Sequence, residues 1–177
     1  MPLLVRFWGR LYRDKLKEMT PRIEKTSERK LIGIQVDMTY ANNQTMALWK
    51  RFMPRRNEMK NRLNEDLISM QLYPEGFSFS NFDLNASFEK WAAAEVSSFD
   101  NIPDEMDCFT LPAGLYAVFE YKGLSTDRSI FQYIFGTWLP ASEYVVDNRP
   151  HFEILGAQYK NNEPDSEEEI WIPIQLK

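Results

Sequence analysis

Cysteine and histidine are nearly absent from this sequence. Its 177 residues contain one cysteine, Cys108, and one histidine, His151. A single cysteine excludes an internal disulfide framework and is typical of a reducing compartment. A single histidine argues against a Ser-His-Asp triad and against a histidine-based metal site. Since no other residues cluster at metal-ligand spacing, we expect neither a metal nor another cofactor.

Long hydrophobic runs and a basic excess are missing as well. No apolar run approaches the roughly 18 residues that cross a membrane. The N-terminus lacks the continuous apolar segment and the small-residue cleavage site of a secretory signal. The net charge is −5 at pH 7, which argues against general nucleic-acid binding because phosphate recognition needs a basic surface. These absences predict a cytoplasmic protein without a transmembrane segment.

Aromatic residues, in contrast, are abundant. Phe, Trp and Tyr make up 14% of the sequence, whereas the hydrophobic fraction of 44% and the charged fraction of 27% are ordinary for a globular protein. Most of these rings belong in a core, but so many also suit the lining of a ligand pocket. The length is that of one domain with one substantial core.

The N-terminal segment, residues 1–21, differs from the rest in charge and pattern. Its apolar and basic residues fall on separate faces of a helical period, which Pro21 ends. Residues 1–19 carry about +3, so the remainder carries about −8. The segment is either an appended helix that packs on the domain or a helix that binds a membrane surface or a partner. The main domain is expected to span residues 22–177.

From Lys30 onward, the hydrophobic pattern predicts the order strand, helix, strand, strand, and then predicts it again. The expected elements of the first round are residues 31–40, 43–63, 67–73 and 88–99, and those of the second are 113–121, 126–138, 152–159 and 168–176. Equal order in the two halves indicates an internal duplication. The expected fold is α+β, an antiparallel sheet with helices on one face and the other face free.

Strand alternation assigns side chains to that free face, if the more apolar set of each strand packs on the helices. The assigned residues are Gln35, Asp37, Ser69, Gln71, Tyr73, Trp91, Ala93, Glu95, Tyr116, Glu120, His151, Glu153, Leu155, Trp171 and Pro173. Large rings beside carboxylates form a surface for flat or cationic ligands, through stacking, cation–π attraction and charge pairing. The alternative is a face buried by a homodimer or by residues 1–20.

Several segments, taken in this order and spacing, resemble the GyrI-like small-molecule-binding domain. They are residues 111–119, Gly123, residues 138–140, the Asn148-Arg149-Pro150-His151-Phe152-Glu153 segment and residues 170–174, with residues 49–56 similar to the free-standing subgroup. The same domain is the effector-binding part of some AraC- and MerR-type transcription regulators. The resemblance covers roughly residues 22–177.

The resemblance implies two β-α-β-β modules related by pseudo-twofold symmetry, with a ligand held between them. In drug-sensing members, a buried glutamate at the base of an aromatic pocket pairs with cationic ligands, and the matching residue here is Glu153. The expected ligand-binding residues are Glu153, Tyr116, Trp91, Trp171, Tyr73 and Glu95. The alternative for Glu153 is a glutamate bonded to backbone or to Tyr116, with no ligand role.

The leading functional hypothesis is therefore that the protein binds a small aromatic or cationic molecule, in order to sense or sequester it, and is not an enzyme. One alternative is hydrolysis of cyclopropane-type genotoxins, with Glu153 as acid–base and Tyr116 as oxygen-polarising donor. Another is a gyrase-inhibitor-like protein. Residues 1–29 are too short for a helix-turn-helix, so direct DNA binding is not expected. Cys108 has no sequence-adjacent base and is expected to be structural or merely tolerated.

Overall fold

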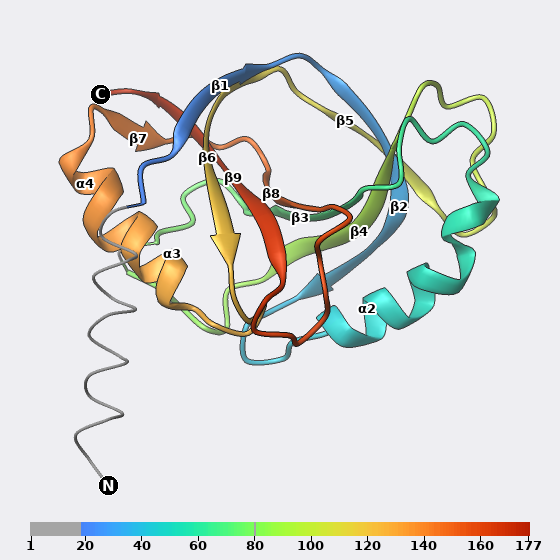
Figure 1. The fold of residues 1–177 in the computed structure, drawn as a ribbon, viewed down its shortest axis with the longest axis horizontal. Helices are drawn as coiled ribbons and strands as arrows, with labels where there is room; N and C mark the ends of the chain where they lie inside the picture. Colours follow the sequence, from blue (N-terminus) through green and yellow to red (C-terminus); the bar gives the residue numbers. More distant parts are fainter. Residues whose placement is uncertain (1–18, 80) are drawn as a thin grey trace, which may run out of the picture.

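The computed structural model describes residues 19–79 and 81–177. Within these residues the chain forms one antiparallel sheet of nine strands with helical segments packed against it (Figure 1). The strands are β1 (Arg22–Thr26), β2 (Arg29–Met38), β3 (Leu67–Leu72), β4 (Phe88–Val96), β5 (Asp107–Leu111), β6 (Gly114–Lys122), β7 (Tyr144–Val146), β8 (His151–Leu155) and β9 (Glu167–Leu176). The helical segments are α2 (Thr45–Phe52), η1 (Met53–Glu58), α3 (Ser129–Tyr133), η2 (Ile134–Trp138) and α4 (Leu139–Ala141).

The strand order places β3 of the first half beside β8 of the second half. It runs β1-β6-β9-β8-β3-β4-β2-β5, with β7 paired to β9. β3 and β8 therefore meet at the centre, where Ser69 lies opposite Glu153 and Gln71 opposite His151. Outward from this centre, β3-β4-β2 on one side corresponds to β8-β9-β6 on the other. A duplicated module would give this order, and the duplication itself remains a prediction.

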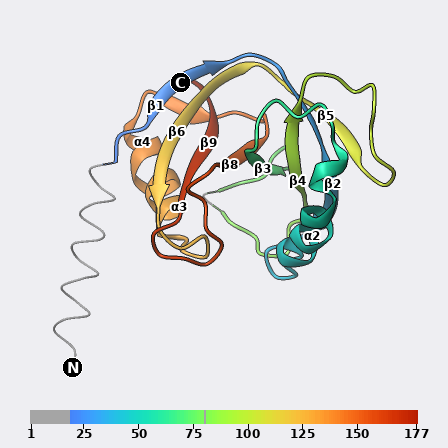
Figure 2. The same ribbon diagram turned by 45° about the vertical axis from the view of Figure 1, so that its right-hand side comes forward.

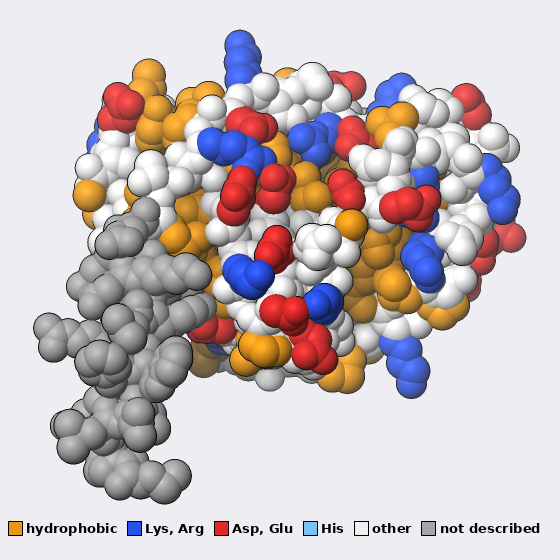
Figure 3. Space-filling view, viewed as in Figure 1, with side chains coloured by type: hydrophobic (Ala, Val, Ile, Leu, Met, Phe, Trp, Pro, Cys, Tyr) orange, Lys and Arg blue, Asp and Glu red, His pale blue; other side chains and the backbone are white. Residues whose placement is uncertain are grey.

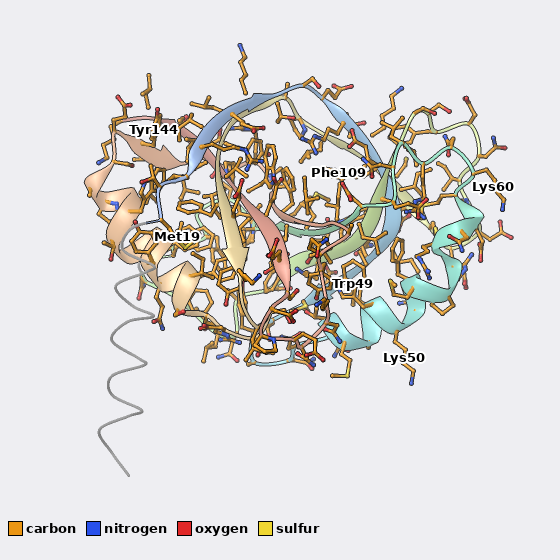
Figure 4. The ribbon with its side chains drawn as sticks, viewed as in Figure 1. Met19, Trp49, Lys50, Lys60, Phe109 and Tyr144 are labelled. Carbon is orange, nitrogen blue, oxygen red and sulfur yellow. The ribbon has the colours of Figure 1, made fainter. Side chains whose placement is uncertain are left out.

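Two apolar clusters lie on the helix-covered face. The α2 cluster joins α2 to the first half of the sheet through Ile32, Ile34, Leu48, Phe52, Met59, Ala92, Ala94, Val96 and Met106. The α3 cluster joins α3 and η2 to the second half through Ala117, Phe119, Tyr121, Ile130, Ile134, Ile170, Ile172 and Ile174. Each helix buries one stripe, as amphipathic helices do, and Lys50 points away from the molecule on α2 (Figure 4).

The opposite face of the sheet is not free. There the sheet curls, with β1 and β6 arching over the top of the molecule while α2 and α3 lie below (Figure 2). The curl encloses a third cluster, here the enclosed cluster: Leu31, Ile68, Met70, Trp91, Ala93, Leu111, Tyr116, Val118, Phe152 and Trp171. These side chains are at most 4% exposed. The expectation of an open face is therefore wrong, because the sheet curls around these side chains.

Close packing between β2 and β4 depends on Gly33. A Cβ atom at this position would lie 2.2 Å from the carbonyl oxygen of Ala92 and 2.7 Å from the Cα of Ala93. These are backbone atoms of the neighbouring strand, so they cannot move aside as a flexible side chain would. Gly33 therefore allows the two strands to approach under the enclosed cluster.

Both predicted helices differ in detail from those observed. The first was expected over residues 43–63, but its α-helical part ends at Phe52 and a 3₁₀ segment with Pro54 near its start follows. The second was expected over residues 126–138; it begins at Ser129, whose N–H donates to Asp127 Oδ1, continues as a π-helix through Trp138 and ends at Ala141. Pro140 therefore lies inside the last turn rather than stopping the helix before it.

Three strands were not predicted: β1, β5 and β7. Their sequences are short and carry little alternation; β1 reads Arg-Ile-Glu-Lys-Thr and β5 reads Asp-Cys-Phe-Thr-Leu. Both extend the sheet by pairing with longer strands, β1 with β6 and β5 with β2. Cys108 lies on β5 and is exposed.

The predicted helix over residues 2–20 lies almost wholly outside the described residues. Met19 is described and packs against the α3 cluster. It lies beside the second helical segment, which consists of α3, η2 and α4 (Figure 4). Its carbonyl oxygen accepts a hydrogen bond of 2.9 Å from the hydroxyl of Tyr133. Among the described helices, none is long and apolar enough to cross a membrane.

Candidate functional site

A strip of polar residues runs along the helix-covered face between the α2 and α3 clusters. We call it the central strip; it comprises Ser69 and Gln71 on β3, Lys90 on β4, Glu153 on β8 and Glu168 on β9. Strand register places these side chains on one face, because Ser69 lies opposite Glu153 and Gln71 lies opposite Lys90. Ionisable residues in a sheet interior are rare unless they are paired, so the strip requires an explanation.

Lys90 and Glu153 form the charged pair of the central strip. The Nζ of Lys90 lies 3.6 Å from Oε2 of Glu153, and the two side chains are only 7% and 14% exposed. The same Nζ donates a 2.7 Å hydrogen bond to Oγ of Ser69. The side-chain amide of Gln71 donates to Oε1 of Glu153 at 3.1 Å. Glu153 is therefore compensated from two strands, and not an isolated buried charge.

Glu168 has a different environment. Within the described residues its carboxyl group makes no hydrogen bond and no ion pair. Burial, and secondarily the negative charge of Glu153, raises the pKa of Glu168 to about 7, while Lys90 acts in the opposite direction. The carboxyl group of Glu168 is therefore protonated in part of the molecules at neutral pH.

A groove with a volume of about 600 Å³ reaches the strip at Glu168. Its lining includes Glu168 but not Glu153, and it runs along the ends of β6, β8 and β9. The lining residues are Met19, Asp66, Glu120, Tyr121, Lys122, Ile154, Gly156, Ala157, Gln158, Glu167, Glu168 and Glu169. This volume is within the range of small-molecule sites.

An aromatic cluster adjoins the other end of the strip. Its members are Tyr40, Tyr73, Phe77, Phe79, Phe82, Phe88, Phe135 and His151. The hydroxyls of Tyr40 and Tyr73 lie 2.6 Å apart in a hydrogen bond. The guanidinium of Arg128 lies 5.7 Å from the centre of the Tyr40 ring, within the range of cation–π attraction.

His151 joins the aromatic cluster to the strip. It is 6% exposed, and burial lowers its pKa to about 3. The imidazole is therefore neutral at physiological pH and packs as a ring, edge-on to Tyr73 and stacked on Phe79. Since His151 and Glu153 are two residues apart on β8, they point to the same side of the sheet about 7 Å apart.

The structure divides the predicted site residues between the two faces of the sheet. Glu153 and Tyr73 lie on the helix-covered face, as do Ser69, Gln71 and His151. Trp91, Tyr116, Trp171 and Glu95 lie on the opposite face. The prediction that Glu153 shares a concavity with Trp91, Tyr116 and Trp171 is wrong.

The reason is an inverted alternation phase in β3 and β8. The apolar residues Ile68 and Met70, like Phe152, face the enclosed cluster and not the helices. Because both faces of β3 are buried, the more apolar set does not identify the helix side. The polar sets of β3 and β8 stay together, as expected, but on the other face.

The rings on the opposite face are core residues. The hydroxyl of Tyr116 donates to the carbonyl oxygen of Pro150 at 3.1 Å, and burial raises the pKa of Tyr116 to about 12. The indole N–H groups of Trp91 and Trp171 donate to Glu89 and Glu169. Tyr116 lies across the sheet from Glu153, so the two do not act on one ligand atom.

Glu95 is engaged at the edge of that same face. Its carboxylate lies 3.8 Å from the guanidinium of Arg29. That guanidinium also lies over the Trp171 ring, at 5.0 Å from its centre. Glu95 therefore belongs to the border of the enclosed cluster.

Sequence reasoning missed Lys90, Glu168, Phe79 and Phe135. Lys90 had a visible signal, because it shares the alternation phase of Ala92 and Ala94 and is the only charged residue in that set of β4. Phe79 and Phe135 are brought together only by tertiary structure. Among the described residues, no three His, Cys, Asp or Glu side chains are grouped to hold a metal ion.

Comparisons with known proteins agree with this fold. The sequence model of the family described as Cass2, integron-associated effector-binding protein, matches residues 22–174. The transcriptional regulator BrlR of Pseudomonas aeruginosa is 24% identical over 162 residues, which are 90% of this chain and 57% of the regulator. The chain thus spans little more than half the length of this curated relative.

Solved structures share the fold at low identity. SAV2435 bound to tetraphenylphosphonium has a TM-score of 0.67 at 17% identity, with 89% of this chain and 94% of that chain covered. The integron cassette protein Cass2 of Vibrio cholerae has a TM-score of 0.59 at 15% identity, with 88% and 96% covered. The C-terminal domain of EcmrR has a TM-score of 0.63 at 14% identity, with 90% and 99% covered. The resemblance to GyrI-like effector-binding domains is confirmed, and this chain belongs to the Cass2 family of integron-associated effector-binding proteins.

Proposed function

We propose that this protein binds a small aromatic cation on the helix-covered face of its sheet, at the central strip. The observation that carries the proposal is the charge of the strip. The strip holds two carboxyl groups, Glu153 and Glu168, and one ammonium group, that of Lys90, which pairs with Glu153. It lies between two apolar clusters and beside the aromatic cluster. A cation that enters adds the missing positive charge, and its aromatic groups find rings to stack on.

Relatives support the chemistry of the ligand. SAV2435, which shares the fold, is bound to tetraphenylphosphonium, a cation whose charge is surrounded by four rings. The groove at Glu168 gives such a molecule a route to the strip from the ends of β8 and β9. A charge buried among rings is favourable only where a carboxylate compensates it, and the strip holds two.

Titration of the protein with a charge-reversed pair tests the proposal. Tetraphenylphosphonium and tetraphenylborate have nearly the same shape and opposite charges. Calorimetry should show binding of tetraphenylphosphonium at least tenfold tighter than binding of tetraphenylborate, because the borate would face two carboxyl groups. Equal binding of both ions would mean that the site selects shape alone, and tighter binding of the borate would contradict the proposal.

Direct DNA binding is not part of the proposed function. The net charge is −5, and on the face shown in Figure 3 acidic and basic side chains are interspersed without a basic patch. EcmrR and BrlR are regulators, and this chain covers 65% of an EcmrR chain seen on DNA and 57% of BrlR. The absence of direct DNA binding and the presence of a homodimer both remain predictions.

A hydrolase is the second candidate. One observation favours it: Glu168 lines the groove, where burial raises its pKa to about 7, a value suited to general acid–base catalysis at neutral pH. A Listeria innocua structure described as a hydrolase shares the fold with a TM-score of 0.55 at 10% identity. Incubation with cyclopropane-bearing electrophiles, followed by mass spectrometry of the small molecules, separates the two functions: a binder leaves them intact, and a hydrolase adds one water.

A further inference from the structure

The ring of Phe79 lies against two walls of the aromatic cluster. It is stacked on Phe135 with ring centres 4.3 Å apart and planes only 5° apart. It also lies 5.0 Å from the ring of His151, at 27°. Tyr73 meets it edge-on at 5.0 Å. These are the offset-stacked and edge-to-face geometries by which proteins hold an aromatic ring.

The residues around Phe79 come from the sheet and from the second helical segment. His151 and Tyr73 stand on the sheet at the ends of β8 and β3, where Gln71 lies opposite His151. Phe135 belongs to η2, the π-helical part of the second helical segment, and packs against the α3 cluster. Single π-helical turns are rare and occur frequently at functional sites. The sheet and the second helical segment together therefore form a receptacle for a ring.

Phe79 itself comes from a long connection. Residues 73–87 join β3 to β4, although antiparallel neighbours usually need only two to five residues. The connection carries three phenylalanines, Phe77, Phe79 and Phe82, among polar residues. Among its described residues, a backbone hydrogen bond from Ala41 to Leu84 ties it to the rest of the chain. Loops that move upon ligand binding are drawn from the less stable parts of a structure, and long connections are common among them.

The receptacle is next to the charged part of the site. His151, its floor, is two residues from Glu153 on the same face of β8, a separation of about 7 Å. A ring in the place of Phe79 stacks on His151, the neighbour of Glu153 on that face of β8. The structure thus combines a charge subsite and a ring subsite in one ligand's reach.

We propose that Phe79 fills the ring subsite of the effector site, and that an aromatic ring of the effector displaces it from Phe135 and His151. This inference rests on the proposed function, and it names the part of the ligand that enters the subsite. In the free protein the subsite is self-occupied, so the measured affinity is the intrinsic affinity reduced by the fraction of molecules in which Phe79 has left.

The test is the sign of one affinity change. Phe79→Ala empties the subsite, so tetraphenylphosphonium should bind tighter, by about threefold to tenfold, because no ring has to leave. Leu84→Ala is the matched control: Leu84 is in the same connection, is 49% exposed and does not belong to the aromatic cluster. This control should leave the affinity unchanged within twofold. Weaker binding by Phe79→Ala would mean that Phe79 contacts the ligand, and unchanged binding would mean that the ligand sits elsewhere; either result overturns the inference.

A second arm does not depend on cation binding. Toluene carries one ring and no charge, so saturation-transfer NMR should detect it bound to Phe79→Ala and not to wild type or Leu84→Ala. If wild type does not bind tetraphenylphosphonium, the proposed function fails, while the toluene arm still decides whether Phe79 fills a ring subsite. Phe79→Leu, which retains an apolar side chain, should fold as wild type and fall between wild type and Phe79→Ala in both assays. Absence of toluene binding to folded Phe79→Ala would overturn the inference.

Discussion

The ammonium group of Lys90 lies 3.6 Å from the carboxylate of Glu153, and both side chains are buried in the sheet. Glu153 is the glutamate that the family resemblance assigns to cation binding, so the free protein already supplies it with an internal cation. A ligand cation therefore does not meet an isolated charge. It joins a network in which Lys90 and Glu153 are paired and Glu168 is the carboxyl without a partner among the described residues.

Removal of the Lys90 charge should lower stability and strengthen cation binding. Lys90→Met keeps the length of the side chain and leaves Glu153 buried without its ion-pair partner, which should cost about 3 kcal/mol of unfolding free energy. The unpaired carboxylate should bind tetraphenylphosphonium about tenfold tighter. Urea denaturation and calorimetry measure the two effects.

The double variant Lys90→Met/Glu153→Gln is the control for that prediction. It contains neither charge, so its stability should return to within about 1 kcal/mol of wild type. Its affinity for the cation should fall below that of Lys90→Met. If Lys90→Met were as stable as wild type and bound the cation no tighter, the pair would have no energetic role.

Stability should depend on pH through Glu168. Its pKa is about 7 in the folded protein and 4.5 as an ordinary glutamate, so between these values the folded state binds the proton more strongly than the unfolded state. The unfolding free energy should therefore fall as pH rises through this window, by up to about 1.4 kcal/mol per pH unit. Glu168→Gln should lack this pH dependence. Denaturation of wild type and of the variant at a series of pH values gives the two unfolding free energies, and their difference isolates the contribution of Glu168. Parallel pH profiles would show that Glu168 titrates normally.

His151 should act in the opposite direction. Burial lowers its pKa from 6.5 to about 3. Between these pH values the imidazole is therefore protonated in the unfolded state and neutral in the folded state. Its contribution to stability is complete above pH 6.5 and is lost as pH falls toward 3, again by up to about 1.4 kcal/mol per unit. The unfolding free energy of wild type minus that of His151→Phe should rise with pH in this range. An NMR titration of His151 with a midpoint near 6.5 would refute the prediction.

Residues 1–18 should be dispensable for the domain, while Met19 should not. Met19 packs on the α3 cluster and accepts a hydrogen bond from Tyr133, so removal of residues 1–20 should cost about 1 kcal/mol more than removal of residues 1–18. Thermal unfolding of the two truncated proteins measures the difference. A large loss of stability upon removal of residues 1–18 alone would show that this segment contributes to the core.

The fold class could be predicted from the sequence because most long strands alternate clearly and each half carries one amphipathic segment. The α+β class, the antiparallel sheet and the helices on one face are as expected. The short edge strand β1 has one apolar residue and gave no signal. The first helix ends earlier than predicted because a 3₁₀ segment with Pro54 near its start follows Phe52.

The site could be predicted only in part. Glu153 and Tyr73 were grouped correctly with Gln71 and His151, because alternation fixes which residues of a strand share a face. Alternation does not decide which face is which when both are buried, and in this protein the curl of the sheet buries both. Trp91 and Trp171 were therefore assigned to a ligand surface and form a core instead.

Two glutamates that the sequence pattern assigned to one face lie on opposite faces of the sheet. Glu153 lies on the helix-covered face in the central strip, and Glu95 lies at the edge of the opposite face beside Arg29. Glu153→Gln removes a charge from the proposed site and leaves Lys90 without its carboxylate. Glu95→Gln is the matched change on the other side of the sheet.

Titration of these two variants with tetraphenylphosphonium is the most direct test of where the effector binds. Glu153→Gln should weaken the cation by roughly 1.5–3 kcal/mol, about tenfold to more than a hundredfold, because a desolvated charge-assisted contact is lost. Glu95→Gln should bind it within about twofold of wild type, since its carboxylate is engaged with Arg29 away from the strip. Loss of binding in Glu95→Gln, with Glu153→Gln unchanged, would place the ligand on the opposite face and contradict the account.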